Sequence, residues 1–303
     1  MPSKPPLLML VKEPAVRCLD HAGDVYDLRR EPGPGIRAAL CAGSGMDSAT
    51  MDAAPDLKMI SLVGVGYDRI DVDHARTRGI AVTNTPDVLT DDVADLAIGL
   101  MLAVARRLPA YDLYVRQGRW AAEGLPPLAR RASGRRVGVL GLGRIGQAIA
   151  ARAAPFASQI GYHSRYPKGE GAEYLYFDRP VALAAWADVL IVAVSGGPAT
   201  AGLVDRRAID ALGPDGTLIN VSRGSVVDEP ELVAALQEGR LGFAGLDVFG
   251  HEPNVPTALL GLDNVVLLPH QGSATRETRQ AMADLGLANL AAFFAGEPLL
   301  TPI

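Results

Sequence analysis

The chain has 303 residues, of which 49% are hydrophobic, and a net charge of −5. This composition is sufficient for about two folded domains and excludes global disorder. The net negative charge argues against a general nucleic-acid-binding protein. Glycine is the unusual component: its 33 residues exceed the usual share of about 7%. Glycine is favoured where backbone approaches backbone or a ligand, so its positions are informative.

Targeting and metal-binding signals are weak. The two cysteines, Cys18 and Cys41, form no CxxC pair, so we expect no thiolate zinc site and no metal. Their scarcity suits a reducing compartment and predicts a cytoplasmic protein. The longest apolar run, Leu96–Ala105, is shorter than the ~20 residues that span a bilayer, so no membrane partner is expected. The first apolar segment, Leu7–Val11, is too short for a signal-peptide core and predicts a strand.

Short β-rich runs alternate with helical stretches along the chain, which predicts an α/β protein whose parallel sheets are flanked by helices on both faces. Long helices are expected over Leu89–Arg107 and Arg276–Phe294, and an extended surface loop over Arg116–Arg135. After Leu7–Val11, the predicted strands are Ile36–Cys41, Met59–Val63, Ile80–Val82, Val137–Leu140, Ile160–Tyr162, Val189–Val194, Thr217–Val221, Phe243–Val248 and Val265–Leu268.

A GxGxxG pattern follows the apolar strand Val137–Leu140 and opens a helix, the context in which such a pattern predicts dinucleotide binding. Gly141 allows a tight turn, Gly143 lets a pyrophosphate approach the backbone, and Gly146 permits close packing of helix on strand. The helix N-terminus adds free N–H groups, so Arg144 and Ile145 join the predicted cofactor site. The alternative is an ordinary strand–turn–helix connection.

The position expected to bind the cofactor ribose carries no acid. An NAD-type site has Asp or Glu about 20 residues after the glycine turn, whereas here the second strand ends in His163, Ser164 and Arg165. A carboxylate would repel a 2′-phosphate, while Arg165 can bind it, with help from Lys168. Ser164 and Arg165 therefore predict NADPH/NADP as the cofactor, with NADH as the less favoured one. The alternative is that Arg165 is an ordinary solvated charge.

Five further segments accompany the glycine turn in a characteristic order: 63–71 (VGVGYDRID), 84–95 (NTPDVLTDDVAD), 220–229 (NVSRGSVVDE), 245–253 (GLDVFGHEP) and 268–275 (LPHQGSAT). Together they resemble the D-isomer-specific 2-hydroxyacid dehydrogenase family over most of the chain. Within that family, Ser164, Arg165 and the chain length are most similar to the NADPH-dependent glyoxylate/hydroxypyruvate reductases and the related hydroxyphenylpyruvate reductases.

The resemblance implies two Rossmann-like domains with a cleft between them. Residues 1–98 and 275–303 would form a flavodoxin-like substrate-binding (catalytic) domain, and residues 99–274 a dinucleotide-binding Rossmann domain. It also implies a homodimer. The loop Trp120–Pro127 resembles a segment that reaches the neighbouring subunit's cleft, although Trp120 also suits an apolar anchor at the dimer contact.

The resemblance implies three catalytic residues: Arg223 holds the substrate carboxylate and polarises the ketone, His270 is the acid, and Glu252 tunes it. Each role is chemically sensible, because guanidinium offers a planar fork and a carboxylate beside an imidazole fixes its tautomer and favours the protonated ring. The alternatives are a helix-entry charge for Arg223 and a simple loop acid for Glu252. His251 is expected to be a surface residue.

The resemblance further places the substrate carboxylate on backbone N–H groups of Gly64, Val65 and Gly66, and Asp247 near the nicotinamide amide. Glycines suit such a loop because they let an anion approach main-chain donors, although a tight turn alone would also require them. Two segments depart from the family pattern. Gln271 stands where an apolar residue is commoner, and 195–200 lacks the usual Leu or His before Pro.

The function implied is NADPH-dependent reduction of a small 2-oxo acid, glyoxylate or hydroxypyruvate, to the D-2-hydroxy acid by hydride transfer. The first alternative is a reductase of larger 2-oxo acids such as hydroxyphenylpyruvate. A phosphoglycerate dehydrogenase is disfavoured because the ribose acid is missing. An alternative of another class is a nucleotide-sensing protein similar to the corepressors that share this fold.

Overall fold

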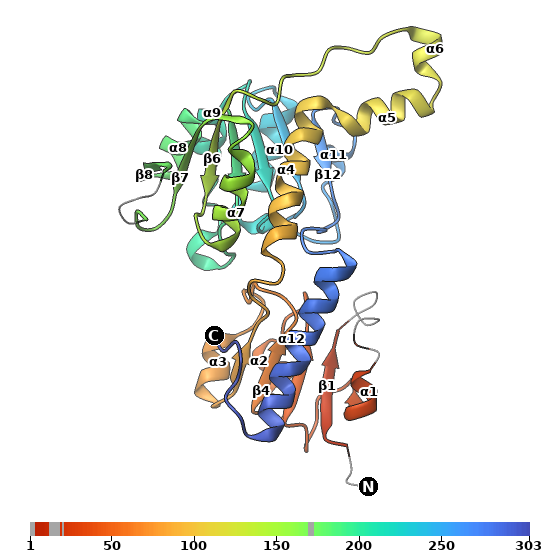
Figure 1. The fold of residues 1–303 in the computed structure, drawn as a ribbon, viewed down its shortest axis with the longest axis vertical. Helices are drawn as coiled ribbons and strands as arrows, with labels where there is room; N and C mark the ends of the chain where they lie inside the picture. Colours follow the sequence, from red (N-terminus) through yellow and green to blue (C-terminus); the bar gives the residue numbers. More distant parts are fainter. Residues whose placement is uncertain (1–3, 12–18, 20, 169–172) are drawn as a thin grey trace. The chain divides into compact units, whose positions relative to one another are not determined.

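The computed structural model describes residues 4–11, 19, 21–168 and 173–303, and the chain separates into two compact units (Figure 1). The first unit comprises Met1–Leu89 and Ser273–Ile303, and the second comprises Thr90–Gly272. Cys18 lies outside the described residues. Within them, no helix combines the length and apolar character that crossing a bilayer requires.

The sheet of the first unit has five parallel strands in the order β2-β1-β3-β4-β5. Its central strands β3 and β4 are buried throughout and rich in apolar residues, as is usual for parallel sheets. The bounds are β1 Pro6–Leu10, β2 Asp27–Arg29, β3 Ala38–Cys41, β4 Met59–Leu62 and β5 Ala81–Thr83, and the helices are α1 Ala22–Val25, α2 Ser48–Asp52, α3 Val72–Thr77 and α12 Arg276–Ala295.

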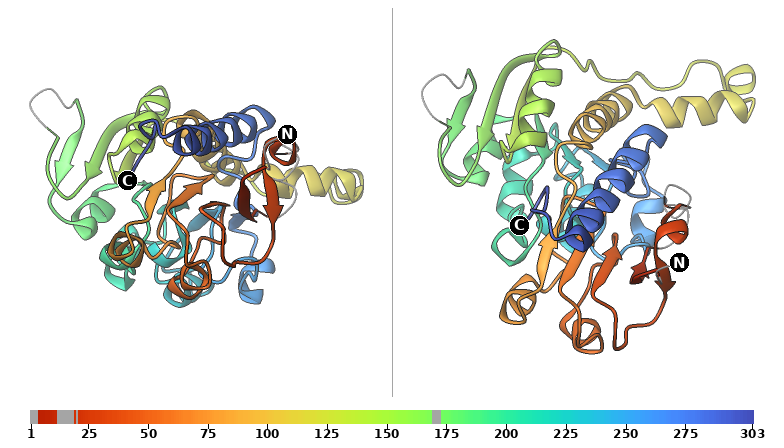
Figure 2. Two further views of the ribbon diagram at one scale, coloured as in Figure 1. Left: turned by 90° about the horizontal axis from the view of Figure 1, so that it is seen from below. Right: turned by 60° about the horizontal axis from the view of Figure 1, so that its bottom comes forward.

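Helix α12 covers one face of this sheet, while α2 and α3 cover the other (Figure 2). On the α12 side, Ser61 of β4 donates its hydroxyl to the carbonyl oxygen of Gly286 at 2.9 Å. A side chain at Gly286 would lie 3.2 Å from Val63, so the glycine permits this close approach. The C-terminal helix is thereby packed against residues more than 200 positions earlier in the chain.

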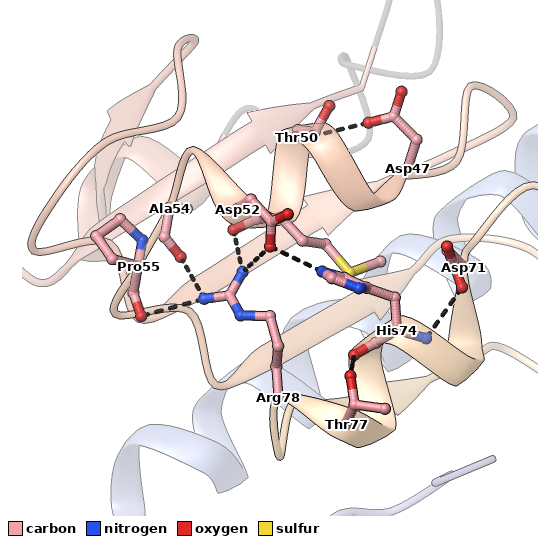
Figure 3. A network of polar contacts seen from close by, with 10 residues as sticks. Asp47, Thr50, Asp52, Ala54, Pro55, Asp71, His74, Thr77 and Arg78 are labelled. Carbon is pink, nitrogen blue, oxygen red and sulfur yellow. Dashed lines mark hydrogen bonds and ion pairs between the residues drawn. The ribbon is translucent and has the colours of Figure 1, made fainter.

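A polar cluster joins α2 to α3 on the opposite face (Figure 3). Nε2 of His74 lies 2.7 Å from Oδ1 of Asp52, and Arg78 donates to the carbonyl oxygens of Ala54 and Pro55 at 3.1 and 3.2 Å. These carbonyls lie in the turn that follows α2, so Arg78 ties that turn to the end of α3. His74 is therefore a structural residue that joins α3 to α2.

The sheet of the second unit has seven parallel strands in the order β12-β11-β10-β9-β6-β7-β8. The order reverses between β6 and β9, and ligands of open α/β sheets bind beyond the carboxyl ends of the strands at such a point. The strands are β6 Arg135–Leu140, β7 Ala157–His163, β8 Leu175–Phe177, β9 Val189–Val192, β10 Thr217–Asn220, β11 Phe243–Leu246 and β12 Val265–Leu267.

Helices cover both faces of this sheet, as predicted. Helices α4 and α7 pack together on one face, and α8, α9 and α10 contribute buried side chains to the core on the other. The bounds are α4 Thr90–Arg106, α5 Leu108–Arg116, α6 Arg119–Glu123, α7 Arg144–Ala153, α8 Pro180–Trp186, α9 Arg206–Leu212, α10 Glu229–Gln237 and α11 Thr257–Leu260, with 3₁₀ turns at Pro198–Thr200 and Gly224–Val226.

The unit boundaries differ from those predicted at 98/99 and 274/275. Helix α4 is continuous from Thr90 and belongs entirely to the second unit. Its first turn is joined to α7 by an ion pair between Asp91 and Arg152 at 2.8 Å. A boundary inside α4 would have separated these two residues, so the chain divides before the helix rather than within it.

The prediction of an extended loop over Arg116–Arg135 is wrong in its first part, where α5 ends and α6 follows (Figure 1). Arg107 adopts a left-handed conformation that ends α4, and Pro109 lies in the first turn of α5. Proline is well suited to that position because its missing N–H has no intrahelical partner there. Pro109 therefore starts a new helix. Residues 124–134 are extended, as expected.

Candidate active site

The glycine turn lies between β6 and α7, at the point where the strand order reverses. Gly141 has a φ of +101°, and a Cβ on Gly146 would lie 1.8 Å from the carbonyl oxygen of Gly141. Gly143 instead faces open space, with nothing within 4 Å of a Cβ built there. Two glycines are thus required by packing, while Gly143 leaves room for a ligand at the N-terminus of α7.

Ser164 and Arg165 follow directly after β7, the strand beside β6. The hydroxyl of Ser164 donates to the carbonyl oxygen of Tyr166 at 2.5 Å, which closes a tight turn. The side chains of Arg165 and Lys168 are exposed. Among the described residues, the turn directly beyond β7 therefore presents two cations and no acid, next to the strand that carries the ribose contact in dinucleotide-binding folds.

The predicted acid and its carboxylate are brought together. Nδ1 of His270 lies 2.9 Å from Oε2 of Glu252, although 18 residues separate them in sequence. Oε1 of Glu252 accepts the backbone N–H of Phe249 at 3.1 Å. The Glu252 side chain is 17% exposed and that of His270 is 46% exposed. With Nδ1 engaged by the carboxylate, Nε2 is the nitrogen available to a substrate.

Asp247 organises the turn that carries His270. It follows β11 directly and is buried, and its carboxylate accepts the backbone N–H groups of Gln271 at 2.6 Å and Gly272 at 2.8 Å. Its carbonyl oxygen accepts the N–H of His270 at 2.8 Å. Burial raises the pKa of Asp247, and the two backbone donors oppose that rise. His270 itself has a φ of +56°, a left-handed conformation held by these bonds.

Arg223 lies in the turn after β10, the strand next to β11. Its carbonyl oxygen accepts from the side chain of Asn220 at 2.9 Å, and its Nη1 donates to the carbonyl oxygen of Ser222 at 2.8 Å. Gly224 packs against the backbone of Phe249, where a Cβ would lie 1.9 Å from the carbonyl carbon. Arg223 thus follows the same edge of the sheet as Asp247 and His270.

Gly64, Val65 and Gly66 form a turn after β4 in the first unit. Thr85 pins the turn twice: its hydroxyl accepts the N–H of Gly64, and its N–H donates to the carbonyl oxygen of Gly64, each at 2.9 Å. Asn84 donates to the carbonyl oxygen of Val65 at 3.0 Å. Among the described residues none accepts from the N–H groups of Val65 and Gly66, so the turn offers two donors.

Sequence reasoning assigned no role to Asn84 and Thr85, which hold this turn. Both are buried polar residues that follow the short strand β5. Polar residues directly after an apolar strand were the available signal, since buried polar groups need hydrogen-bond partners. His251, predicted to be a surface residue, is exposed. Within the described ranges, no group of three or more His, Cys, Asp and Glu side chains could hold a metal ion.

Comparison with known proteins gives a consistent result. Residues 98–272 match the family model of the D-isomer specific 2-hydroxyacid dehydrogenase, NAD binding domain. The chain is 55% identical over 269 residues to hydroxyphenylpyruvate reductase from Plectranthus scutellarioides, covering 88% of this chain and 85% of the relative. It is 46% identical over 311 residues to 2-ketogluconate reductase from Gluconobacter oxydans, covering all of both chains.

Among solved structures, the chain is similar to an NADPH-dependent glyoxylate/hydroxypyruvate reductase from Sinorhizobium meliloti in complex with NADP and malonate. The TM-score is 0.94 and the sequence identity 45%, over 99% of this chain and 97% of the other. A likeness of this extent covers both units of the chain.

Proposed function

The chain belongs to the D-isomer specific 2-hydroxyacid dehydrogenase family, and we propose that it reduces a small 2-oxo acid, glyoxylate or hydroxypyruvate, to the D-2-hydroxy acid with NADPH. The observation that carries this proposal is the contact between His270 and Glu252 at 2.9 Å, at the carboxyl edge of the second sheet. The relatives named above are all reductases, which favours an enzyme over the nucleotide-sensing alternative.

The residues of the glycine turn fit a dinucleotide. Gly143 leaves open space above the N-terminus of α7, where backbone N–H groups and the helix dipole favour a pyrophosphate. Arg144 and Ile145 begin that helix and would contribute such N–H groups. When bound, the nicotinamide supplies a hydride from its C4 atom. Asp247, whose carboxylate already holds two backbone N–H groups, is assigned to the region of the nicotinamide amide.

The chain's own residues supply the rest of the reaction. Arg223 would bind the carboxylate and polarise the carbonyl oxygen, because guanidinium can meet two oxygens at once. Nε2 of His270 would donate a proton to that oxygen as negative charge develops on it. Glu252 stabilises the protonated ring throughout. The N–H groups of Val65 and Gly66 are proposed as further donors to the substrate carboxylate.

The preference for NADPH rests on Arg165, supported by Lys168. Both are exposed directly beyond β7, and no carboxylate of the residues described up to Lys168 lies in that turn. A guanidinium can form charge-assisted bonds to a 2′-phosphate that NADH lacks. The Sinorhizobium reductase, which binds NADP, is consistent with this assignment. We also propose a cytoplasmic location, which is supported only by the low number of cysteines.

The substrate range has a second candidate. The 55% identical relative is named as a hydroxyphenylpyruvate reductase, so reduction of larger 2-oxo acids remains the alternative activity. The decisive experiment is a panel of glyoxylate, hydroxypyruvate and hydroxyphenylpyruvate with NADPH and with NADH, followed by loss of the reduced cofactor's absorbance. We expect the highest kcat/KM for a small 2-oxo acid with NADPH. Turnover of none of them would reject the proposal, and a preference for NADH would reject its cofactor.

We also propose that the protein is a homodimer. Helices α5 and α6 extend away from the rest of the second unit (Figure 1), and they and the following segment expose apolar side chains. These are Leu108, Leu113, Val115, Trp120, Leu125 and Leu128, the last two being 84% and 95% exposed. Contiguous exposed apolar residues mark interaction surfaces. Light scattering should give twice the mass of one chain, and Trp120→Ala should weaken the dimer; a monomer would refute the proposal.

A further inference from the structure

Gln271 follows the proposed acid His270 and carries an exposed amide side chain. Its backbone N–H donates to Oδ1 of Asp247 at 2.6 Å, and its side-chain Nε2 donates to the carbonyl oxygen of Pro269 at 2.9 Å. The neighbouring N–H of Gly272 is held by the same carboxylate at 2.8 Å. Both the backbone and the tip of the Gln271 side chain are therefore fixed in the turn.

The hydrogen bond to Pro269 determines which way the amide points. A carbonyl oxygen can only accept, so the amide atom bonded to it must be the nitrogen, and Oε1 must lie on the other side. Among the described residues none donates to Oε1. The turn thus presents an exposed acceptor whose orientation is set by the backbone that also carries His270.

This acceptor belongs to a residue adjacent to the proton donor. Consecutive Cα atoms are about 3.8 Å apart. In a 2-oxo acid, C3 is bonded directly to the carbon that bears the reacting oxygen, so a substituent on C3 lies close to the atom that His270 protonates. A hydroxyl group donates one hydrogen bond and is the natural partner of a fixed amide oxygen. An apolar side chain at position 271 would offer no such partner.

On the premise of the proposed 2-oxo acid reductase activity, we propose that the amide of Gln271 selects substrates carrying a hydroxyl group on C3. Hydroxypyruvate has this group, whereas pyruvate and hydroxyphenylpyruvate lack it on C3 and glyoxylate has no C3. Longer 2-oxo sugar acids carry it as well. Gln271 is therefore a specificity residue that separates hydroxylated from unsubstituted substrates, while the reaction itself is left to His270, Glu252 and Arg223.

Pyruvate and hydroxypyruvate provide the test, because they differ only in this hydroxyl group. Gln271→Met keeps the length of the side chain and removes the amide. We expect the ratio of kcat/KM for hydroxypyruvate to that for pyruvate to fall about 5- to 10-fold, the usual effect of one neutral hydrogen bond. Gln271→Leu should lower the ratio similarly. This second apolar replacement keeps the test available if Gln271→Met does not fold. Gln280→Met, on an exposed position of α12, should leave the ratio unchanged.

The outcomes separate this inference from the proposed function. A wild-type protein that reduces no 2-oxo acid rejects the proposed function. If the wild type is active but Gln271→Met and Gln271→Leu retain its ratio, the specificity role is rejected while the activity stands. Equal losses with both substrates also reject it, because they would show that Gln271 only supports the turn. A selective loss with hydroxypyruvate supports the inference.

Discussion

The carboxylate of Glu252 lies 2.9 Å from Nδ1 of His270, so one residue orients the ring of the predicted acid and leaves its Nε2 for a substrate. The carboxylate is itself oriented, because its other oxygen accepts the backbone N–H of Phe249 at 3.1 Å. A carboxylate fixed in this way stabilises the protonated ring more strongly than a mobile one, since no side-chain entropy is lost when the contact forms.

Replacing this carboxylate should weaken the reduction reaction. Glu252→Gln keeps the shape of the side chain but removes the charge that favours protonated His270. We expect kcat for reduction to fall about 10- to 100-fold, within the range of acid–base contributions. Steady-state kcat for the variant and for Glu297→Gln, an exposed control, would decide; an unchanged kcat in Glu252→Gln would exclude the role.

Asp247→Asn should disturb the same turn by another route. The amide would place an NH₂ group against one of the backbone N–H groups that the carboxylate now accepts, at Gln271 or Gly272. One hydrogen bond is lost, at a cost of about 1–3 kcal/mol for a buried group. We expect lower activity, since the N–H of His270 donates to the carbonyl of the same residue.

The difference in stability between the wild type and Asp247→Asn should change with pH in a defined direction. Burial raises the pKa of Asp247, so the folded protein binds this proton more tightly than the unfolded chain does. Stability from the group is complete below its unfolded pKa of about 3.9 and is lost as pH rises through the folded pKa. The advantage of wild type over Asp247→Asn in thermal unfolding should therefore narrow from low pH towards pH ~7. A stability difference that widens towards pH ~7 would contradict the raised pKa of Asp247.

Two glycines of the glycine turn, Gly143 and Gly146, should respond differently when each is replaced by alanine. A Cβ on Gly146 would lie 1.8 Å from the carbonyl oxygen of Gly141, whereas one on Gly143 meets nothing within 4 Å. Gly146→Ala should therefore lower the melting temperature by several degrees, as an overpacked site does. Gly143→Ala should melt near wild type but bind NADPH more weakly in a fluorescence titration. Similar melting losses in both variants would show that Gly143 is also required for folding.

The sequence predicted those parts of the fold where local patterns and tertiary contacts agree. The strands around Val137 and Val189 and the helix after Thr275 were placed correctly, because apolar runs bounded by turn residues are unambiguous. Strands β2 and β8, of three residues each, were missed, and β2 has a single apolar residue between Asp27 and Arg29. Helices α5 and α6 were missed because local composition favours a loop there, and Pro109 is compatible both with the end of one helix and with the first turn of the next.

The sequence predicted which residues belong to the site, but not the hydrogen bonds that hold them in place. His270 and Glu252 were paired from the resemblance, and the structure brings them together. Both oxygens of Asp247 accept backbone N–H groups of the turn that carries His270. No sequence pattern reveals such backbone donors. The same applies to Thr85, whose two bonds shape the Gly64 turn from 21 residues away.

Arg165 should determine the cofactor preference. Its side chain is exposed directly beyond β7, where no described acid competes for a 2′-phosphate. Arg165→Ala removes a charge-assisted interaction worth about 1.5–3 kcal/mol, so the ratio of kcat/KM for NADPH to that for NADH should fall about 10- to 100-fold. Arg179→Ala, an exposed arginine of the same unit, is the matched control and should keep the wild-type ratio. If both variants keep it, the 2′-phosphate is bound by other residues, and Lys168 becomes the next position to test.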